Sequence, residues 1–117
     1  MTPKELARAI AKVLDQKKAE DIKVIQITEL TIIADYFVIA SGTSNTHTKS
    51  LADDVEFELA KLGAPNPRLE GRATGWILMD YGSVLVHVFQ KESREYYNLE
   101  RLWSDAVTMD ISDILTD

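Results

Sequence analysis

The stretch Asp35-Tyr-Phe-Val-Ile-Ala-Ser-Gly-Thr-Ser-Asn45 decides the fold of this 117-residue chain. It opens with an uninterrupted apolar run, Tyr36 to Ala40, which is typical of a strand buried on both faces of a sheet. Small residues follow, and Ser44 or Asn45 is suited to cap a helix. A strand, a tight elbow and a helix in this order predict an α/β fold with a crevice at the carboxyl end of the strand.

The segments around the elbow carry further helix and strand signals. Thr2-Pro3-Lys4-Glu5 has the form of a capping box with proline at the first helical position. Gly63 is suited to end the helix that follows the elbow. In chain order we expect a helix over 3–16, strands over 21–27 and 36–40, a helix with the apolar stripe Leu51, Val55, Leu59 and Leu62, an edge strand over 68–70, a hairpin of 76–80 and 83–89, and a helix over 92–103 that breaks near Asn98.

Length and composition are those of one ordinary globular domain. Apolar residues make up 45% of the chain and charged residues 27%, and there is no cysteine. The lack of cysteine excludes disulfides, a thiol nucleophile and zinc sites with cysteine ligands. The length, the composition and the order of the elements together predict a single α/β domain with a mixed β-sheet of four to five strands covered by helices.

Charge and hydropathy indicate where the chain acts. The segment that begins Met1-Thr2-Pro3-Lys4-Glu5 is amphipathic and charged where a signal peptide needs an uninterrupted apolar core. No run approaches the roughly 20 apolar residues that span a bilayer, so we expect a cytoplasmic protein without a membrane partner. The net charge of −6 leaves no surplus of lysine and arginine to neutralise phosphates. Strong direct binding to nucleic acid is therefore not expected.

The acidity is concentrated in the last fourteen residues. Four aspartates and no lysine or arginine lie in this segment, and subtracting their charges from the total of −6 leaves −2 for residues 1–103. We therefore divide the chain into a domain over 1–103 and an acidic tail over 104–117. A short amphipathic helix is predicted in the tail, because four apolar residues share one helical stripe: Val107, Ile111, Ile114 and Leu115.

The elbow has the form of an anion site. Backbone N–H groups beside small side chains, together with the helix dipole, favour an anion at Ser41, Gly42, Thr43 and Ser44. Neither a phosphate-binding loop with its lysine nor the dinucleotide pattern G-x-G-x-x-G is present, so a tight strand-to-helix turn explains the same residues. Both interpretations stay open, with a nucleotide-binding or nucleotidyltransferase-type enzyme centred on Ser41 to Thr46 as the enzymatic alternative.

The residues that such an enzyme needs are missing from the sequence pattern. Nucleotidyl transfer uses clustered carboxylates that hold magnesium, but Asp53 and Asp54 are adjacent on a helix and Asp80 stands alone on its strand. His47 and His87 belong to no local metal-binding pattern. We interpret His87 as structural and His47 as a solvated helix residue, with contact to an anion as its alternative. No catalytic residue, metal or cofactor is predicted.

The strand that begins at Trp76 offers a surface for a partner. With a period of two, Trp76, Leu78 and Asp80 share one face, and a carboxylate on that face indicates contact with water. An apolar pair beside a charge is typical of a docking surface. Alternatively, Trp76 lies under a helix and Asp80 caps the hairpin. The aromatic segment Arg94 to Trp103 likewise has more than one interpretation: an interaction helix, a helix packed on the sheet, or a homodimer contact.

Taken together, several blocks closely resemble the ribosomal silencing factor family, also called Iojap-related. The resemblance covers about residues 3–105 and leaves the acidic tail outside. Each block is short, and their order and spacing make the resemblance specific. The blocks are Asp35 to Asn45, Glu70-Gly71, Gly75-Trp76-Ile77-Leu78, Asp80-Tyr81-Gly82, Val86-His87-Val88-Phe89 and Arg94 to Trp103.

The resemblance implies a translation repressor that is not an enzyme. Its partner would be the large ribosomal subunit, bound through the fourteenth large-subunit ribosomal protein where the small subunit docks, so that protein synthesis falls when nutrients are scarce. The implied fold is nucleotidyltransferase-like without the catalytic carboxylates. Under this resemblance the elbow becomes a vestigial anion site, and the partner-binding residues become Glu70, Trp76, Leu78, Asp80 and Tyr81.

Overall fold

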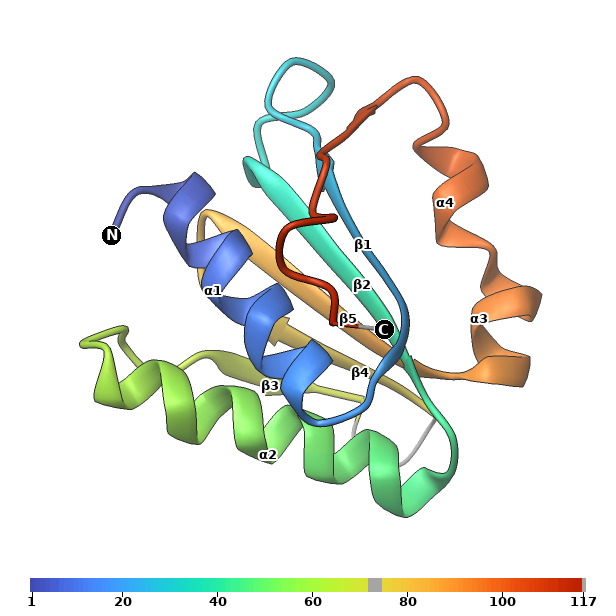
Figure 1. Cartoon of the computed structure of the whole chain (residues 1–117). Helices are drawn as coiled ribbons and strands as arrows, with labels where there is room; N and C mark the ends of the chain where they lie inside the picture. The colour runs from blue at the N-terminus through green and yellow to red at the C-terminus, as the bar shows by residue number, and fades with distance from the viewer. Residues whose placement is uncertain (72–74, 117) are drawn as a thin grey trace.

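The described residues fold around one mixed β-sheet of six strands, in the order β3-β4-β5-β2-β1-β6. The computed structural model describes residues 1–71 and 75–116. Strands β2 and β5 run parallel, and every other neighbouring pair is antiparallel (Figure 1). The strands are β1 (Glu20–Gln26), β2 (Tyr36–Gly42), β3 (Arg68–Glu70), β4 (Trp76–Asp80), β5 (Val84–Gln90) and β6 (Val107–Thr108).

Strand β2 is the most buried element, as its apolar run predicts. All seven of its residues are buried between β5 and β1. Alternate side chains enter two different clusters, with Val38 on one face of the sheet and Phe37 and Ile39 on the other. This alternation follows from the period of two in a strand, and it means that both faces need a cover.

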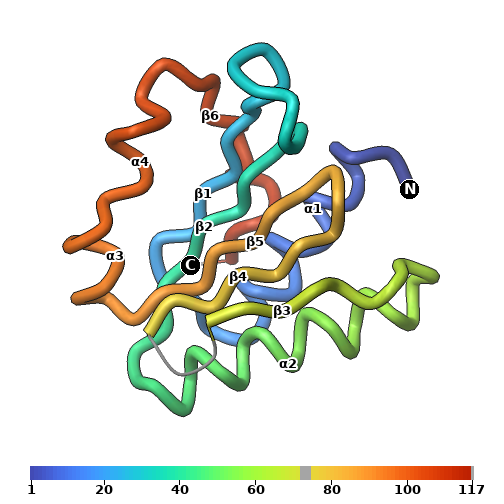
Figure 2. Tube along the Cα trace, turned by 180° about the vertical axis from the view of Figure 1, so that it is seen from behind, coloured from blue at the N-terminus to red at the C-terminus, as the bar shows by residue number. Residues whose placement is uncertain are grey.

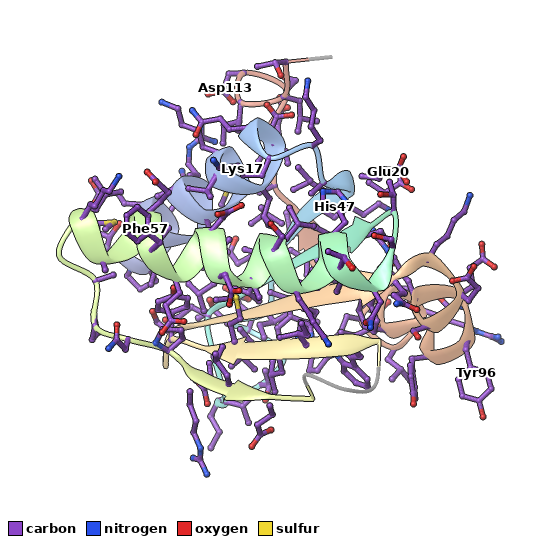
Figure 3. All side chains as sticks on the ribbon, turned by 90° about the horizontal axis from the view of Figure 1, so that it is seen from below. Lys17, Glu20, His47, Phe57, Tyr96 and Asp113 are labelled. Atoms are coloured by element: carbon purple, nitrogen blue, oxygen red, sulfur yellow. The ribbon has the colours of Figure 1, made fainter. Side chains whose placement is uncertain are left out.

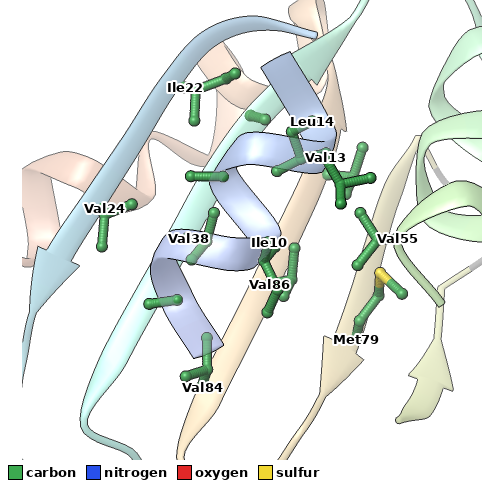
Figure 4. Close-up of a cluster of buried hydrophobic side chains, with 14 of the residues drawn as sticks. Ile10, Val13, Leu14, Ile22, Val24, Val38, Val55, Met79, Val84 and Val86 are labelled. Atoms are coloured by element: carbon green, nitrogen blue, oxygen red, sulfur yellow. The ribbon is translucent and has the colours of Figure 1, made fainter. Parts of the chain in front are cut away.

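Helices α1 (Pro3–Gln16) and α2 (Asn45–Lys61) cover the first face. The capping box is formed, because Thr2 and Glu5 exchange both hydrogen bonds that it requires. Ile10 and Leu14 of α1 are fully buried in the cluster that contains Val38 (Figure 4). The predicted stripe of α2 is confirmed except at Leu62, which lies beyond the last helical residue and is exposed.

The second face is covered only in part. Helices α3 (Lys91–Tyr97) and α4 (Leu99–Leu102) lie over it, separated by Asn98 in the left-handed conformation, so the predicted break is confirmed. Leu99 and Trp103 pack on the cluster of Phe37 and Ile39. Among the described residues, no helix lies in front of β3, β4 and β5 when the sheet is seen from behind (Figure 2).

The predicted helix in the tail is wrong. Val107 and Thr108 form β6, which pairs with Ile25 and Gln26 of β1. With this strand the sheet has six strands among the described residues, whereas four to five were expected. The edge of β1 offers backbone partners that a helix would leave unused, and the Met109 N–H also donates to the Val24 carbonyl at 2.8 Å. Beyond β6, Ile111 enters the first cluster and Asp113 pairs with Arg8 of α1.

The buried position of Ile111 gives a test of how far the tail contributes to stability. Ile111→Ala should lower the free energy of unfolding by about 2–3 kcal/mol, since it removes a core side chain that is 6% exposed. Leu115→Ala is the matched control, because Leu115 is 43% exposed and should change the free energy by less than about 1 kcal/mol. Urea unfolding of both variants measures the difference, and equal midpoints would show that the tail is only loosely attached.

Candidate functional site

Four of the predicted partner-binding residues lie together on the uncovered part of the second face. Trp76, Leu78 and Asp80 alternate along β4 with the buried Ile77 and Met79, so the predicted division of faces is confirmed. Glu70 of the edge strand β3 is exposed and pairs directly with Leu78. We call Glu70, Trp76, Leu78 and Asp80 the Trp76 face.

The Trp76 side chain is half-buried, with one side packed on neighbouring residues and the other exposed to solvent. Its indole Nε1–H donates to Nδ1 of His87 at 3.1 Å. Its ring centroid lies 5.0 Å from that of Phe89 and 4.8 Å from that of Tyr97. Trp76 therefore belongs partly to the second cluster, and these contacts fix the orientation of the ring that it presents to solvent.

His87 is a buried structural residue. Only 4% of it is exposed, and its ring packs edge-on against Phe37 with centroids 4.7 Å apart. Because Nδ1 accepts the Trp76 hydrogen bond, the proton of the neutral ring lies on Nε2, which has no hydrogen-bond partner in the described part of the chain. Burial disfavours the charged imidazolium and lowers the pKa of His87 to about 4.

Asp80 has a structural role in addition to its position on this face. Its Oδ1 accepts a hydrogen bond from the N–H of Gly82 at 2.7 Å, which caps the turn between β4 and β5. Gly82 has φ of 88°, a conformation that favours glycine. The hairpin predicted from Tyr81-Gly82 is therefore formed, and Asp80 stabilises it.

Tyr81 is not brought together with Trp76. It is the next residue after β4, and its ring packs against the first cluster, on the face that α1 and α2 cover. Its hydroxyl is buried without a hydrogen-bond partner among the described residues. Burial, with a smaller contribution from the charge of Glu56, raises the pKa of Tyr81 to about 12. The alternation of side chains along the strand already predicts Tyr81 on the face of the sheet opposite to that of Trp76.

The elbow after β2 uses its polar groups within the chain. The Thr43 N–H donates to Nδ1 of His47 at 2.9 Å, and the N–H of His47 donates to Oγ of Ser44 at 3.0 Å. The Nε2 atom of His47 lies 3.0 Å from the carbonyl oxygen of Lys17, so His47 ties the elbow to the end of α1 (Figure 3). The expectation of a merely solvated His47 is wrong, because both ring nitrogens have partners.

The small residues of the elbow fit its packing. A Cβ atom added to Gly42 would lie 2.5 Å from Oγ1 of Thr48, so glycine allows α2 to turn back closely. A crevice of about 400 Å³ lies nearby, at the carboxyl ends of the parallel strands β2 and β5. Glu20 and Glu92 line it against one cation, Lys91, which is unfavourable for an anion. The described residues contain no cluster of three or more potential metal ligands.

Arg94 was not predicted as a buried side chain. It is 9% exposed, and its guanidinium donates to Oγ of Ser41 at 2.8 Å and to Oε1 of Glu100 at 2.9 Å. The ammonium group of Lys23 lies 2.8 Å from the same carboxylate. The hydrogen bond from Arg94, followed by the one from Lys23, lowers the pKa of Glu100 to about 2. Ser41 thus anchors α3 to the end of β2.

Comparisons with known proteins identify relatives over the length of the chain. The sequence model of the family described as "ribosomal silencing factor during starvation" matches residues 1–117, including the tail. The chain belongs to the ribosomal silencing factor family. A ribosomal silencing factor from Halalkalibacterium halodurans is 36% identical over 117 residues, covering 99% of this chain and 100% of the relative.

A more distant relative and a solved structure extend the family match. A mouse protein named "mitochondrial assembly of ribosomal large subunit protein 1" is 36% identical over 99 residues, which cover 81% of this chain and 43% of the mouse protein. A crystal structure of a protein from Chromobacterium violaceum superimposes with a TM-score of 0.85 at 32% identity, covering 89% of this chain and 88% of that one. No helix among the described residues is long and apolar enough to cross a membrane.

The buried His87 makes stability depend on pH. The unfolded chain binds a proton at His87 below about pH 6.5, whereas the folded chain does so only near pH 4. The unfolded state is therefore favoured as the pH falls through this window, and the free energy of unfolding should drop by about 2 kcal/mol between pH 7 and pH 5. His87→Gln, which keeps an acceptor for Trp76, should flatten this dependence in urea unfolding. An unchanged slope would mean that another group causes it.

Proposed function

We propose that this member of the ribosomal silencing factor family represses translation by binding the large ribosomal subunit. Contact is made through the fourteenth large-subunit ribosomal protein, and the bound molecule blocks joining of the small subunit when nutrients are limiting. The observation that carries the proposal is the family match over residues 1–117. The mouse relative, whose printed name refers to assembly of the large subunit, supports the same ribosomal particle.

The Trp76 face suits such a contact. A half-buried aromatic and a half-buried leucine form its centre, and the carboxylates of Glu70 and Asp80 lie beside them. Aromatic anchors at the centre of an interface commonly supply most of the binding free energy, and acidic groups at the rim speed association with a basic ribosomal protein. Tyr81, on the opposite face, has no part in this contact.

The proposed block of subunit joining depends on the size of the bound protein and requires no enzymatic reaction. The folded chain measures 34 × 33 × 29 Å. A body of this size on the joining surface prevents a second subunit from approaching to within contact distance, so the proposed repressor is not an enzyme and needs no cofactor. A homodimer is also proposed, and it would compete with ribosome binding if it used the Trp76 face.

The chain offers a matched pair of tryptophans for testing the docking face. Trp76→Ala should leave the far-ultraviolet circular dichroism unchanged and weaken association with purified large subunits at least 30-fold, because it removes a central anchor. Trp103 packs on the same cluster, with its ring centroid 5.2 Å from that of Phe37, but it comes from the end of α4 and not from β4. Trp103→Ala should lose stability and keep association.

Co-sedimentation with isolated large and small subunits measures both effects. Wild-type protein is expected with the large subunit only. Failure of the wild type to sediment with large subunits would overturn the proposed function. Equal losses in the two tryptophan variants would indicate a general effect of destabilisation and would remove the assignment of the Trp76 face.

A nucleotide-binding enzyme is the second candidate, and the crevice at the ends of β2 and β5 is the observation that favours it. Its acidic lining and the internal partners of the elbow argue for weak or absent binding. Calorimetric titration with nucleoside triphosphates and magnesium should therefore give no heat above dilution. Saturable binding that Gly42→Ala abolishes would revive the enzymatic candidate.

A further inference from the structure

A second hollow, of about 250 Å³, lies between α3 and the neighbouring ends of β1 and β2. Its lining comes from the first half of β1, the last part of β2, α3 and the start of α4, and Figure 1 shows α3 beside these strand ends. The charged residues of the lining are Asp21, Lys23, Lys91, Arg94, Glu95 and Glu100. Among the described residues, the hollow shares only Lys91 with the crevice at the elbow, so the two are separate.

Arg94 brings a buried guanidinium to this hollow. The side chain is nine-tenths buried, and its Nη1 and Nε atoms donate to Ser41 and Glu100. No described residue accepts from Nη2, and Nη2 is not among the buried atoms that lack a partner, so it is in contact with solvent in the hollow. A guanidinium that is fixed through two of its nitrogens presents the third in a defined direction, and a carboxylate is a partner that suits its N–H groups.

One carboxylate of the lining is already used within the chain. Glu100 accepts from Arg94, and it also pairs with the ammonium group of Lys23 at 2.8 Å. Three other charged residues of the lining are exposed and form no ion pair with a described residue: Asp21, Lys91 and Glu95. The hollow therefore offers two cationic groups and two carboxylates to a ligand.

Charges of both signs in one small hollow favour a ligand that carries both. The lining has three basic and three acidic side chains, so its formal charges cancel. A phosphate or nucleotide would meet the carboxylates, and a metal ion would meet the cations without any group of three potential ligands among the described residues. A small zwitterion instead satisfies the charges of both signs.

We propose that this hollow, here called the Arg94 hollow, binds a free α-amino acid. Nη2 of Arg94 and the ammonium group of Lys91 hold the carboxylate of the ligand, while Asp21 and Glu95 hold its α-ammonium group. The volume of about 250 Å³ lies below the range of roughly 300–1,000 Å³ that is typical for drug-sized ligands, so it suits a small metabolite. This inference goes beyond the proposed function and does not depend on it.

Three small probes separate the two charges of the ligand. L-alanine carries both, propionate lacks the ammonium group, and ethylammonium lacks the carboxylate. Each is titrated into the full-length, ¹⁵N-labelled protein at pH 7 and followed by nuclear magnetic resonance. L-alanine should shift the backbone signals of Lys91 and Asn98 in a saturable way, and the other two probes should bind at least about 10-fold more weakly, because each loses one set of charged hydrogen bonds. The Nε–H signal of Arg94 should move with L-alanine, since it belongs to the guanidinium that holds the carboxylate.

Two exposed residues of α3 test the two ends of the ligand without disturbing the core. Lys91→Gln should weaken binding of L-alanine about 3- to 10-fold, and Glu95→Gln should do the same from the ammonium end. Glu92→Gln is the matched control, because Glu92 lies on the same helix and lines the crevice at the elbow instead. It should bind L-alanine as the wild type does. All three variants should keep the wild-type urea midpoint, because the three side chains are exposed.

The outcomes decide the inference separately from the proposed function. The absence of a saturable response to L-alanine, or equal responses to the three probes, would overturn the Arg94 hollow as an amino-acid site. Binding that leaves the Arg94 Nε–H signal unmoved, or that Glu92→Gln weakens as much as Lys91→Gln, would place the ligand elsewhere and would overturn it as well. Co-sedimentation of the wild type with large subunits is measured without added amino acid, so either result can fail while the other stands.

Discussion

The structure depends on the complete burial of β2 between an antiparallel and a parallel neighbour. A strand buried on both faces can be stable only if each face of the sheet receives a cover. Helices α1 and α2 supply one cover with fully buried aliphatic residues such as Ile10 and Leu51. The parallel pairing of β2 with β5 also requires a long crossover, which α2, β3 and β4 provide.

The second face is covered unevenly, and the surface proposed for docking lies where the cover is thinnest. Helices α3 and α4 and the residues after them cover the region of Phe37 and Ile39. Toward β4, cover is provided by Trp76 itself, which stacks on Phe89 and hydrogen-bonds to His87. An aromatic side chain that ends a core and faces solvent exposes apolar area at a fixed orientation. Such an area is suited to a partner, because it loses little conformational freedom on binding.

Local patterns predicted most of the fold, and contacts between distant residues account for what they missed. The capping box at Thr2 and the buried run at Tyr36 act through neighbouring residues, so the sequence shows them directly. Strand β6 has only two residues, and its existence depends on a free edge of β1 far away in the chain. At the site, the period of two predicted the face of Trp76. The burial of Arg94 depends on Ser41, 53 residues away, which no local pattern reveals.

The elbow after β2 shows how a scaffold with the form of a ligand site serves packing instead. An anion site needs N–H and hydroxyl groups that are free to turn toward a ligand. Here the Thr43 N–H is used by His47, and the Ser41 hydroxyl accepts from Arg94, which anchors α3. The contact with Ser41 therefore helps to position the helix that carries Tyr97 beside Trp76, whereas His47 connects the elbow to the end of α1. Ser41, one of the residues expected at an anion site, therefore supports a helix beside the surface that is proposed to bind the partner.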